Sequence, residues 1–376
     1  MRRFDVAIVG AGPAGAVAAR VLARSGARVA LIDGSHPREK ACGGGVTARA
    51  SALAGCAPRG GLPIDSVTFE AGARRATVSL ADPQSLRVFS RESFDAALHG
   101  EARDAGAESI PKRVKSFSRD GTTWTIHAAS EAVQARWLFG ADGAGGMVRR
   151  QVFRPFERRQ LSIAAGSYVD GIETREITIG FLDRPRGYLW SFPREGHLAV
   201  GSCAQADEAS TADMHAATDS WLDAYAPAAG RVRRRYAWPI PSLGVRDIDA
   251  EQPAGDGWML LGDAAGLVDP ITREGIYFAI RSGQLAAEAM ELRSPSGAYA
   301  EKIRAELHSE LRRAARLKAG FYRPKFTRLL VDALNGSDAI QSVMVDLVAG
   351  RQPYAGLKRR LLRTLEFGLM LRLLAA

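Results

Sequence analysis

Cysteine is scarce in this chain of 376 residues, and its distribution excludes several kinds of site. The sequence contains only Cys42, Cys56 and Cys203, with no CxxC pair and no spacing typical of metal ligands. Three scattered cysteines cannot supply the four thiolates of a ferredoxin-like cluster, and they do not indicate a structural zinc site. We therefore expect no metal site and a reducing compartment, which predicts a cytoplasmic protein.

Long apolar runs are also missing, so we expect no membrane-spanning helix. The start, Met-Arg-Arg followed at once by a strand-like segment, lacks the apolar region and cleavage site of a signal peptide. Positive charge is in excess, because 51 Lys and Arg face 41 Asp and Glu, for a formal charge of +10. Such a surface attracts anionic lipid or acidic substrates, or it simply reflects an arginine-rich composition; we expect no nucleic-acid partner.

The N-terminal segment carries a nucleotide-binding pattern. Residues 4–9 and 28–32 predict two strands, joined by GAGPAG and an Ala-rich helix, and an acid follows the second strand. The first glycine permits a tight turn, the second lets the backbone approach a pyrophosphate, and the third allows close helix–strand packing. The acid accepts a hydrogen bond from a ribose hydroxyl. The candidate nucleotide-binding residues here are Gly10, Ala11, Gly12, Pro13, Ala14, Gly15, Asp33 and Gly34.

Two later segments distinguish FAD from NAD. Residues 137–143 and 258–266 each predict an apolar strand that ends beside an aspartate, and a helix-like segment follows from about residue 277. The second aspartate suits the ribityl or pyrophosphate part of a longer cofactor, and the helix start faces the flavin ring. These segments add Asp142, Gly143, Gly262, Asp263, Gly275 and Ile276 to the candidate FAD-binding residues. We expect the FAD to be bound noncovalently.

Four segments resemble the geranylgeranyl reductase family of FAD-dependent oxidoreductases, which have the para-hydroxybenzoate hydroxylase fold. They are VGAGPAGAVAARVLARSGARVALID at 9–33, KACGGGV at 40–46, GYLWSFP at 187–193 and GDAAGLVDPITREGI at 262–276, and FSRESFDAAL at 89–98 is a weaker match. The resemblance implies FAD contacts for Lys40, Cys42, Gly43, Gly44 and Arg91, and a substrate tunnel lined by Tyr188, Trp190 and Phe192. Two positions depart from the family: Arg273 replaces a more frequent glycine, and Gly146 a more frequent serine.

Two of these assignments have a second interpretation from the residues alone. Tyr188, Trp190 and Phe192 alternate, so on a strand they share one face, which is either an apolar wall for a ligand or a layer of the core. Cys42 is either a catalytic proton donor or a small packed hydrophobe. The sequence leaves both pairs of alternatives open.

The overall pattern predicts an α/β protein with a Rossmann-like FAD-binding domain, an antiparallel β-sheet substrate domain and a C-terminal helical region. We expect the FAD-binding domain to be discontinuous (1–65, 88–152 and 251–292), with the substrate domain at 66–87 and 153–250. The helical region covers 293–376. No second GxGxxG with its own strand and helix occurs, so NADPH or reduced ferredoxin would act only as a transient electron donor.

The leading functional prediction is reduction of carbon–carbon double bonds in a polyprenyl, geranylgeranyl-type lipid by hydride transfer from reduced FAD. One alternative is an FAD-dependent hydroxylase or halogenase that acts on an aromatic or lipid substrate, although the halogenase motif WxWxIP is absent. A second alternative is a flavin-binding sensor without turnover. The ferredoxin-like cluster of the related quinone-reducing flavoproteins cannot be built here.

Residues 357–376 predict an amphipathic helix. Leu357, Leu361, Leu365, Leu369 and Leu373 recur at a spacing of four, and arginines surround this stripe. This composition is typical of a helix lying in the interface of a membrane, and equally of a terminal helix packed on the protein's own core. A polyprenyl substrate favours peripheral binding at the inner face of the membrane.

Overall fold

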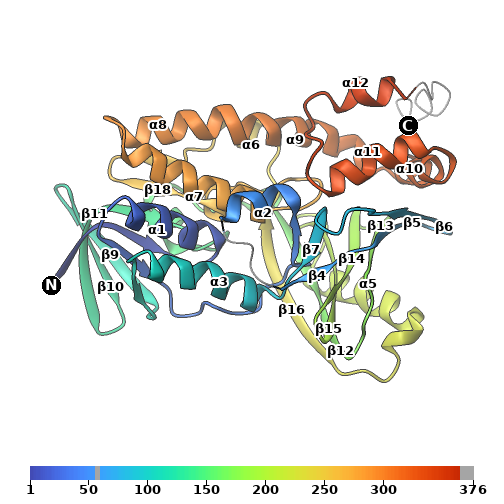
Figure 1. The fold of residues 1–376 in the computed structure, drawn as a ribbon, viewed down its shortest axis with the longest axis horizontal. Coiled ribbons are helices and arrows are strands. Elements are labelled where there is room, and N and C mark those ends of the chain that lie inside the picture. Colours follow the sequence, from blue (N-terminus) through green and yellow to red (C-terminus); the bar gives the residue numbers. More distant parts are fainter. Residues whose placement is uncertain (56–59, 365–376) are drawn as a thin grey trace.

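A computed structural model describes residues 1–55 and 60–364, and Figure 1 shows its two large sheets and the helices that cover them. Cys56 and residues 365–376 lie outside the described part. The order of elements along the chain alternates between the two sheets, so neither sheet is built from one continuous segment.

The first sheet is built around parallel strands. It contains β1 (Arg2–Val9), β2 (Val29–Ile32), β8 (Glu108–Ile110), β9 (Val114–Asp120), β10 (Thr123–Ala128), β11 (Glu131–Gly140), β17 (Ala254–Gly255) and β18 (Trp258–Leu260). The order is β17-β18-β11-β1-β2-β8, with β10 and β9 attached antiparallel to β11. Because β18, β11, β1, β2 and β8 run parallel, the predicted Rossmann-like sheet is confirmed.

Helices cover the parallel sheet and form the C-terminal region, and the helix at Thr211–Ala224 packs on the second sheet. They are α1 (Pro13–Arg24), α2 (Ala48–Ala54), α3 (Arg91–Asp104), α4 (Met147–Val152), α5 (Thr211–Ala224), α6 (Val245–Asp249), α7 (Ile276–Met290), α8 (Pro295–Lys302), α9 (Ser309–Phe321), α10 (Pro324–Gly336), α11 (Asp338–Val348) and α12 (Leu357–Leu362). Short 3-10 turns η1 (Arg158–Gln160), η2 (Ala226–Ala228) and η3 (Gly262–Ala265) and a π-helix, η4 (Ile303–His308), link them.

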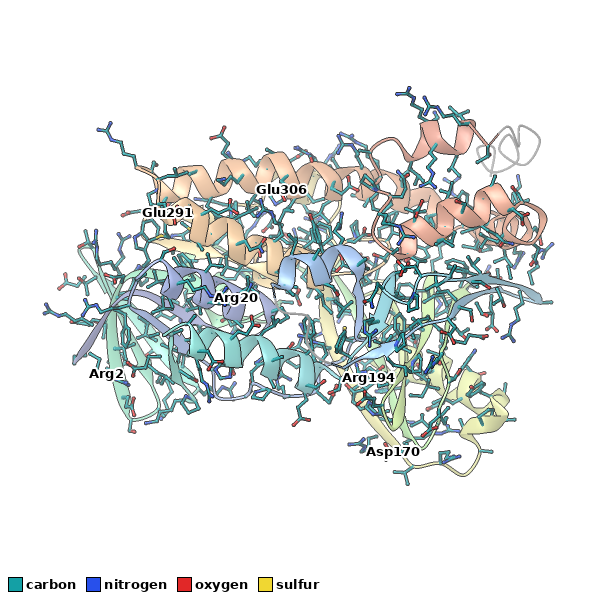
Figure 2. The ribbon with its side chains drawn as sticks, in the orientation of Figure 1. Arg2, Arg20, Asp170, Arg194, Glu291 and Glu306 are labelled. Atoms are coloured by element: carbon teal, nitrogen blue, oxygen red, sulfur yellow. The ribbon has the colours of Figure 1, made fainter. Side chains whose placement is uncertain are left out.

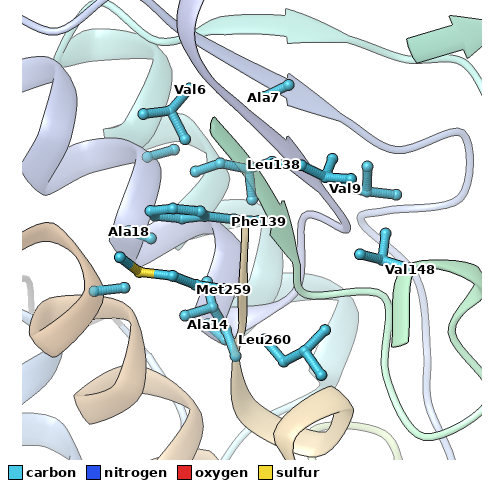
Figure 3. Packing of buried hydrophobic residues seen from close by; sticks show 14 of the residues in the cluster. Val6, Ala7, Val9, Ala14, Ala18, Leu138, Phe139, Val148, Met259 and Leu260 are labelled. Carbon is cyan, nitrogen blue, oxygen red and sulfur yellow. The ribbon is translucent and has the colours of Figure 1, made fainter. Parts of the chain in front are cut away.

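The core of this half forms between the parallel strands and α1. Figure 3 shows Val6, Phe139 and Met259, from three neighbouring strands, packed against Ala14 and Ala18 of α1. The small residues of α1 also allow α7 to approach, since a Cβ at Gly283 would lie 2.5 Å from the carbonyl oxygen of Ala14. Close packing of α1 between the sheet and α7 holds the N-terminus of α1 at the carboxyl end of β1.

The second sheet is mostly antiparallel. Its strands are β16 (Arg233–Pro241), β12 (Leu161–Asp170), β15 (His197–Gln205), β14 (Gly187–Arg194), β13 (Glu176–Leu182), β5 (Ser66–Ala71) and β6 (Arg74–Ser79), in that order across the sheet. Every neighbouring pair is antiparallel except β13 and β5. The prediction of a second, antiparallel sheet is therefore confirmed with one parallel pair. A small third sheet joins β3 (Gly45–Thr47), β7 (Leu86–Val88) and β4 (Leu62–Pro63).

The C-terminal region is helical, as predicted, and it lies along one side of both sheets (Figure 1). Apolar residues of α10 and α11 pack on β5 and β6. Only the first turns of the predicted helix at 357–376 are described, as α12, where Leu357 and Leu361 are half-buried and Leu362 is 39% exposed. Within residues 1–55 and 60–364, no helix is both long and apolar enough to cross a membrane.

Candidate active site

A cavity of about 520 Å³ opens at the carboxyl ends of β1, β2 and β11. Parallel α/β sheets bind their ligands at this edge. The lining includes many of the residues predicted to bind FAD, namely Gly10, Gly12, Pro13, Ala14, Asp33, Gly34, Lys40, Arg91, Asp142, Gly143, Gly262 and Asp263. The structure thus brings together residues from five separate stretches of the sequence.

The three glycines of the first turn have different surroundings. Gly10 has a φ of +106°, and a Cβ there would lie 2.3 Å from the carbonyl oxygen of Ala141. A Cβ at Gly15 would lie 1.9 Å from the carbonyl oxygen of Gly10, so this glycine serves the packing of α1 on the turn. At Gly12 the nearest atom is His36 Nε2 at 3.6 Å. Gly12 alone therefore faces space that a ligand can occupy.

Asp33 belongs to a chain of charged groups that runs beneath the cavity. Its carboxylate accepts hydrogen bonds from the Ala11 backbone N–H (2.9 Å) and from His36 Nδ1 (2.8 Å). The other ring nitrogen of His36 lies 3.4 Å from the carboxylate of Asp95, which forms a 2.9 Å ion pair with Arg91. A ribose hydroxyl that donates to Asp33 would therefore share or replace one of these bonds.

Opposite charges in this chain stabilise one another despite burial. Burial disfavours the charged forms, but the hydrogen bonds and charge of His36 hold the pKa of Asp33 well below its usual value. In the same way burial lowers the pKa of His36, yet its two carboxylate partners, Asp33 and Asp95, raise it overall. Sequence reasoning missed His36 and Asp95, although Asp95 follows Arg91 by four residues, the spacing at which side chains pair on a helix such as α3.

The end of β11 contributes Asp142, which accepts a hydrogen bond from the Val148 backbone N–H at 3.0 Å. Its other carboxylate oxygen is buried without a partner among the described residues, and burial raises the pKa of this group. A Cβ at Gly146 would lie 2.2 Å from that same oxygen. A serine side chain at position 146 would therefore clash with Asp142 in its present position, whereas glycine leaves room for it.

An unpredicted ion pair connects α4, which follows β11, to the segment around residues 251–266. Arg149 is fully buried on α4, and its guanidinium donates to both carboxylate oxygens of Glu251, at 2.6 and 2.9 Å. It also donates to the carbonyl oxygen of Ala264 at 3.0 Å. Arg149 thereby fixes the segment that carries Gly262 and Asp263.

The segment at 39–45, here called the glycine loop, is held from two sides. On the nucleotide side, Lys40 forms a 2.9 Å ion pair with Asp263. From the second sheet, the Tyr168 hydroxyl donates to the carbonyl oxygen of Lys40 at 2.8 Å. Arg194 at the end of β14 donates to the carbonyl oxygens of Cys42 and Gly43 and pairs with Glu39.

Arg194 is 2% exposed, and it lies near the middle of the molecule in Figure 2, where the two sheets meet. Sequence reasoning also missed this residue, because its position after the aromatic motif gives no sign of which distant backbone it contacts. Its five donors suit it to hold several carbonyl oxygens and a carboxylate at once. Arg194 therefore sets the course of the loop that carries Cys42.

The three aromatic residues of the YLWSFP segment, Tyr188, Trp190 and Phe192, lie on β14, and we call these three side chains the aromatic row. Tyr188, Trp190 and Phe192 pair with Cys203, Gly201 and Ala199 of β15, so they share one face as predicted. Tyr188 and Trp190 are 8% and 5% exposed, and they cluster with Tyr322 of the C-terminal region. Phe192 covers the glycine loop, since a Cβ at Gly43 or Gly45 would lie 2.8 or 2.9 Å from its ring.

Cys42 is half-buried at the turn of the glycine loop. Its sulfur accepts a hydrogen bond from the Gly44 backbone N–H at 3.3 Å. The thiol packs against a buried apolar cluster that includes Phe89 and Ile276 at the start of α7. Burial opposes the charge of Arg91, but the neighbouring Asp95 and Cys42 raise the pKa of Arg91 above its usual value. The thiol thus lies beside a permanent positive charge.

The cavity suits FAD in charge, shape and unused bonding capacity. Basic side chains line it, as a diphosphate requires: Arg38, Lys40, Arg91, Arg113 and Arg150. Its volume falls within the range of cofactor pockets. Among the described residues, the second oxygen of Asp142 and the indole N–H of Trp238, another lining residue, have no partner and could bind a ligand. Gly275, Ile276 and Cys42 are not among the lining residues, although a Cβ at Gly275 would lie 3.4 Å from the carboxylate of Asp263.

Such a site, on two sheets of this topology, defines a flavoprotein. Residues 3–290 match the FAD binding domain family, and the chain belongs to that family. It is an FAD-dependent oxidoreductase related to geranylgeranyl reductases.

Its relatives include reductases of two kinds. A menaquinone reductase of Mycolicibacterium smegmatis is 30% identical over 324 residues, which cover 77% of this chain and 76% of that protein. A chloroplastic geranylgeranyl diphosphate reductase of Oryza sativa is 27% identical over 389 residues, covering 94% and 78%. A geranylgeranyl bacteriochlorophyll reductase-like structure from Thermoplasma acidophilum has a TM-score of 0.78 at 22% identity, covering 97% and 100%, and confirms the fold.

Proposed function

We propose that the protein reduces carbon–carbon double bonds of a polyprenyl lipid. The aromatic row carries this proposal, because it is an apolar face that begins at Phe192, directly on the glycine loop with Cys42. Reduced FAD supplies the hydride for such a reduction when it is bound. The aromatic row would hold the apolar chain and exclude water, and the chain's own residues would supply the proton.

Cys42 is our candidate for the proton donor. In this step the alkene carbon that does not receive the hydride takes the proton of the Cys42 thiol. The double bond is then saturated, and Cys42 is left as a thiolate. The Arg91 guanidinium beside the sulfur stabilises that negative charge. Solvent then returns the proton to the sulfur.

The cofactor contacts follow from the cavity. We propose that Gly12, Pro13 and the N-terminus of α1 hold the diphosphate, and that Asp33 binds a ribose. Lys40, Asp263 and Arg91 would lie along the ribityl part, and Gly275 and Ile276 at the ring. NADPH or reduced ferredoxin would supply electrons transiently. The boundaries 1–65, 88–152 and 251–292 for the FAD-binding domain, with 66–87 and 153–250 for the substrate domain, remain our proposal.

Lipid analysis of cells with and without the gene tests the function. We expect polyprenyl lipids of the producing cells to gain two hydrogens for each double bond that is reduced. Geranylgeranyl-type diphosphates and menaquinones are examined separately by mass spectrometry, since relatives of both kinds exist. Identical lipid profiles in the two strains would contradict the proposal.

Cys42→Ser and Cys42→Ala distinguish the two roles of the thiol. Cys42→Ser keeps a group that can donate a proton, although a weaker acid, so it should retain FAD and lose most of the reduction. Cys42→Ala should lose more. Near-native rates for both variants would leave Cys42 as a packing residue.

We further propose that residues 357–376 bind a membrane surface from which such a lipid is collected. In the described part, Leu362 is exposed, as are the cations Lys358 and Arg359. Deletion of 357–376 should move the protein out of the membrane fraction, and high salt should do so in part. Aggregation or loss of FAD on deletion would instead show that the segment belongs to the core.

A further inference from the structure

Arg273 occupies an unusual position in the loop before α7. Its φ is +59°, in the left-handed region that side chains other than glycine rarely adopt. The side chain donates to the Ser162 hydroxyl at 3.0 Å and to the carbonyl oxygen of Ile271 at 3.3 Å. A strained backbone that is retained for a particular side chain suggests that the side chain has a function.

A second cation, Lys318 on α9, reaches the same place. Its ammonium donates to the side-chain oxygen of Gln205 and to the Ser242 hydroxyl, both at 2.7 Å. Gln205 is the register partner of Ser162 across β15 and β12. The two cations thus hydrogen-bond to adjacent side chains at the ends of two neighbouring strands, β12 and β15. We call Arg273 and Lys318 the cation pair.

The cation pair lies at one end of the face that carries the aromatic row. Along β15, Cys203 pairs with Tyr188, and Gln205, two residues further, points to the same face. The Tyr188 hydroxyl also donates to the carbonyl oxygen of Thr272, next to Arg273, at 2.6 Å. One face of the sheet therefore leads from Phe192 at the glycine loop, along Trp190 and Tyr188, to two positive charges.

Arg273 and Lys318 are half-buried, and their partners differ from those of the buried arginines. Arg20, Arg91, Arg149 and Arg194 each form an ion pair with a carboxylate. Neither Arg273 nor Lys318 forms one with any described residue, although Asp269, Asp207 and Glu208 are near enough to act on their charges. Burial and the charge of Arg273 lower the pKa of Lys318 to about 7. An anion bound between the two cations would relieve this repulsion.

We propose that the cation pair binds the phosphate or diphosphate head of an isoprenoid substrate whose apolar chain lies along the aromatic row. The assignment rests on the proposed function for the identity of the apolar chain. Phosphate oxygens accept the remaining donors of a guanidinium and an ammonium in this arrangement. A neutral quinone head would leave both charges without a partner, so the pair selects anionic lipids over menaquinone-type lipids.

Binding to the oxidised, FAD-saturated protein tests this proposal without turnover. Calorimetry measures the affinity for inorganic diphosphate, farnesyl diphosphate and farnesol, while flavin absorbance checks that FAD stays bound. We expect farnesyl diphosphate to bind most tightly. Arg273→Gly and Lys318→Met should each weaken it about tenfold or more, since each removes a charge-assisted contact. Farnesol binding should not change.

Two further variants guard against indirect effects. Lys302→Met removes the same charge from α8, where Lys302 pairs with Glu288 at 3.1 Å, and should leave diphosphate binding unchanged. Arg273→Lys keeps the charge and should retain part of the affinity. Equal affinity of wild type, Arg273→Gly and Lys318→Met for farnesyl diphosphate would overturn the proposal. Farnesyl diphosphate binding no tighter than inorganic diphosphate would overturn it as well, because the site would then take free anions.

Binding and activity measurements together distinguish a failure of the cation-pair proposal from a failure of the proposed reduction. Diphosphate binding that depends on the pair, in a protein that reduces no polyprenyl lipid, would support the pair and contradict the function. Reduction of farnesol and farnesyl diphosphate at equal rates, in wild type and Arg273→Gly alike, would support the function and contradict the pair.

Discussion

The two ends of the site treat charge in opposite ways. At the nucleotide end, Asp33, His36, Asp95 and Arg91 form one chain in which each charge has a partner. At the far end of the aromatic row, Arg273 and Lys318 have only neutral partners among the described residues. Paired charges cost little free energy in the protein without ligand, whereas half-buried cations without a carboxylate partner are costly until an anion binds.

This difference matches the two kinds of ligand that we assign. A cofactor that stays bound suits a preorganised binding site, in which the protein's own charged groups hold one another in place. A substrate that enters and leaves requires charges that the protein does not neutralise itself. The four predictions below test this contrast, from the largest expected effect to the smallest.

Substitutions in the first turn should separate folding from cofactor binding. Gly15→Val places a side chain on the carbonyl oxygen of Gly10, 1.9 Å from its Cβ, and should prevent α1 from packing. We expect little folded protein from this variant. Gly12→Val meets no protein atom closer than 3.6 Å at its Cβ, so it should fold and yet be colourless. Circular dichroism and flavin absorbance measure the two effects, and a yellow Gly12→Val protein would contradict our placement of the diphosphate.

Arg194→Met should destabilise the junction of the two sheets. It removes the cation that pairs with Glu39 and the donor to two loop carbonyl groups. Because Glu39 is partly exposed and keeps its hydrogen bond from the Ser90 hydroxyl, we expect a loss of about 3 kcal/mol, the lower end of the range for buried pairs. Denaturant unfolding measures the loss. The double variant Arg194→Met with Glu39→Gln should recover part of it, because no unpaired charge remains. A loss below about 1 kcal/mol, as for exposed pairs, would show that the loop does not depend on Arg194.

His36→Asn should cost about 1–3 kcal/mol, the range for hydrogen bonds to charged groups. Because folding raises the pKa of His36, its contribution is fully present below its unfolded pKa and is lost as the pH rises through the folded value. The stability difference between wild type and variant should therefore shrink as the pH rises above about 6.5, the ordinary pKa of histidine. A difference that does not depend on pH would mean that His36 acts as a neutral spacer.

Arg273→Gly should instead stabilise the folded protein. Glycine adopts a φ of +59° without strain, so the folded protein should gain about 1 kcal/mol. Removal of one of two unpaired cations adds to the gain. Thermal unfolding of the holoprotein without lipid is the measurement, and Arg273→Lys, which keeps both the strain and the charge, is the control. A destabilised Arg273→Gly protein would show that the arginine supports the fold.

The fold was largely predictable because its signals are local. Residues 4–33 carry strand, turn, helix and strand in order, and β1, α1 and β2 follow that pattern closely. The alternation of Tyr188, Trp190 and Phe192 correctly predicted a shared strand face. Sequence could not tell whether this face binds a ligand or fills the core, and the burial of Tyr188 and Trp190 is compatible with both.

The groups that were missed make their contacts over long separations in sequence. Arg194 holds Cys42, and Arg149 pairs with Glu251, so neither pairing follows from spacing along the chain. Lys318 lies near Arg273 only because the two side chains hydrogen-bond to Gln205 and Ser162, which pair across β15 and β12. Arg273 did stand out as a departure from glycine, but its backbone strain and its neutral partners became visible only in three dimensions.

Anaerobic mixing of the dithionite-reduced holoprotein with geranylgeranyl diphosphate tests the proposed reduction most directly. Flavin absorbance is followed over time, and the fully saturated diphosphate of the same chain length serves as the control. We predict that the oxidised flavin band returns with the unsaturated lipid alone, and that the recovered lipid has gained two hydrogens for each flavin oxidised. A flavin that stays reduced with both lipids, in a protein shown to bind the unsaturated one, would contradict polyprenyl reduction.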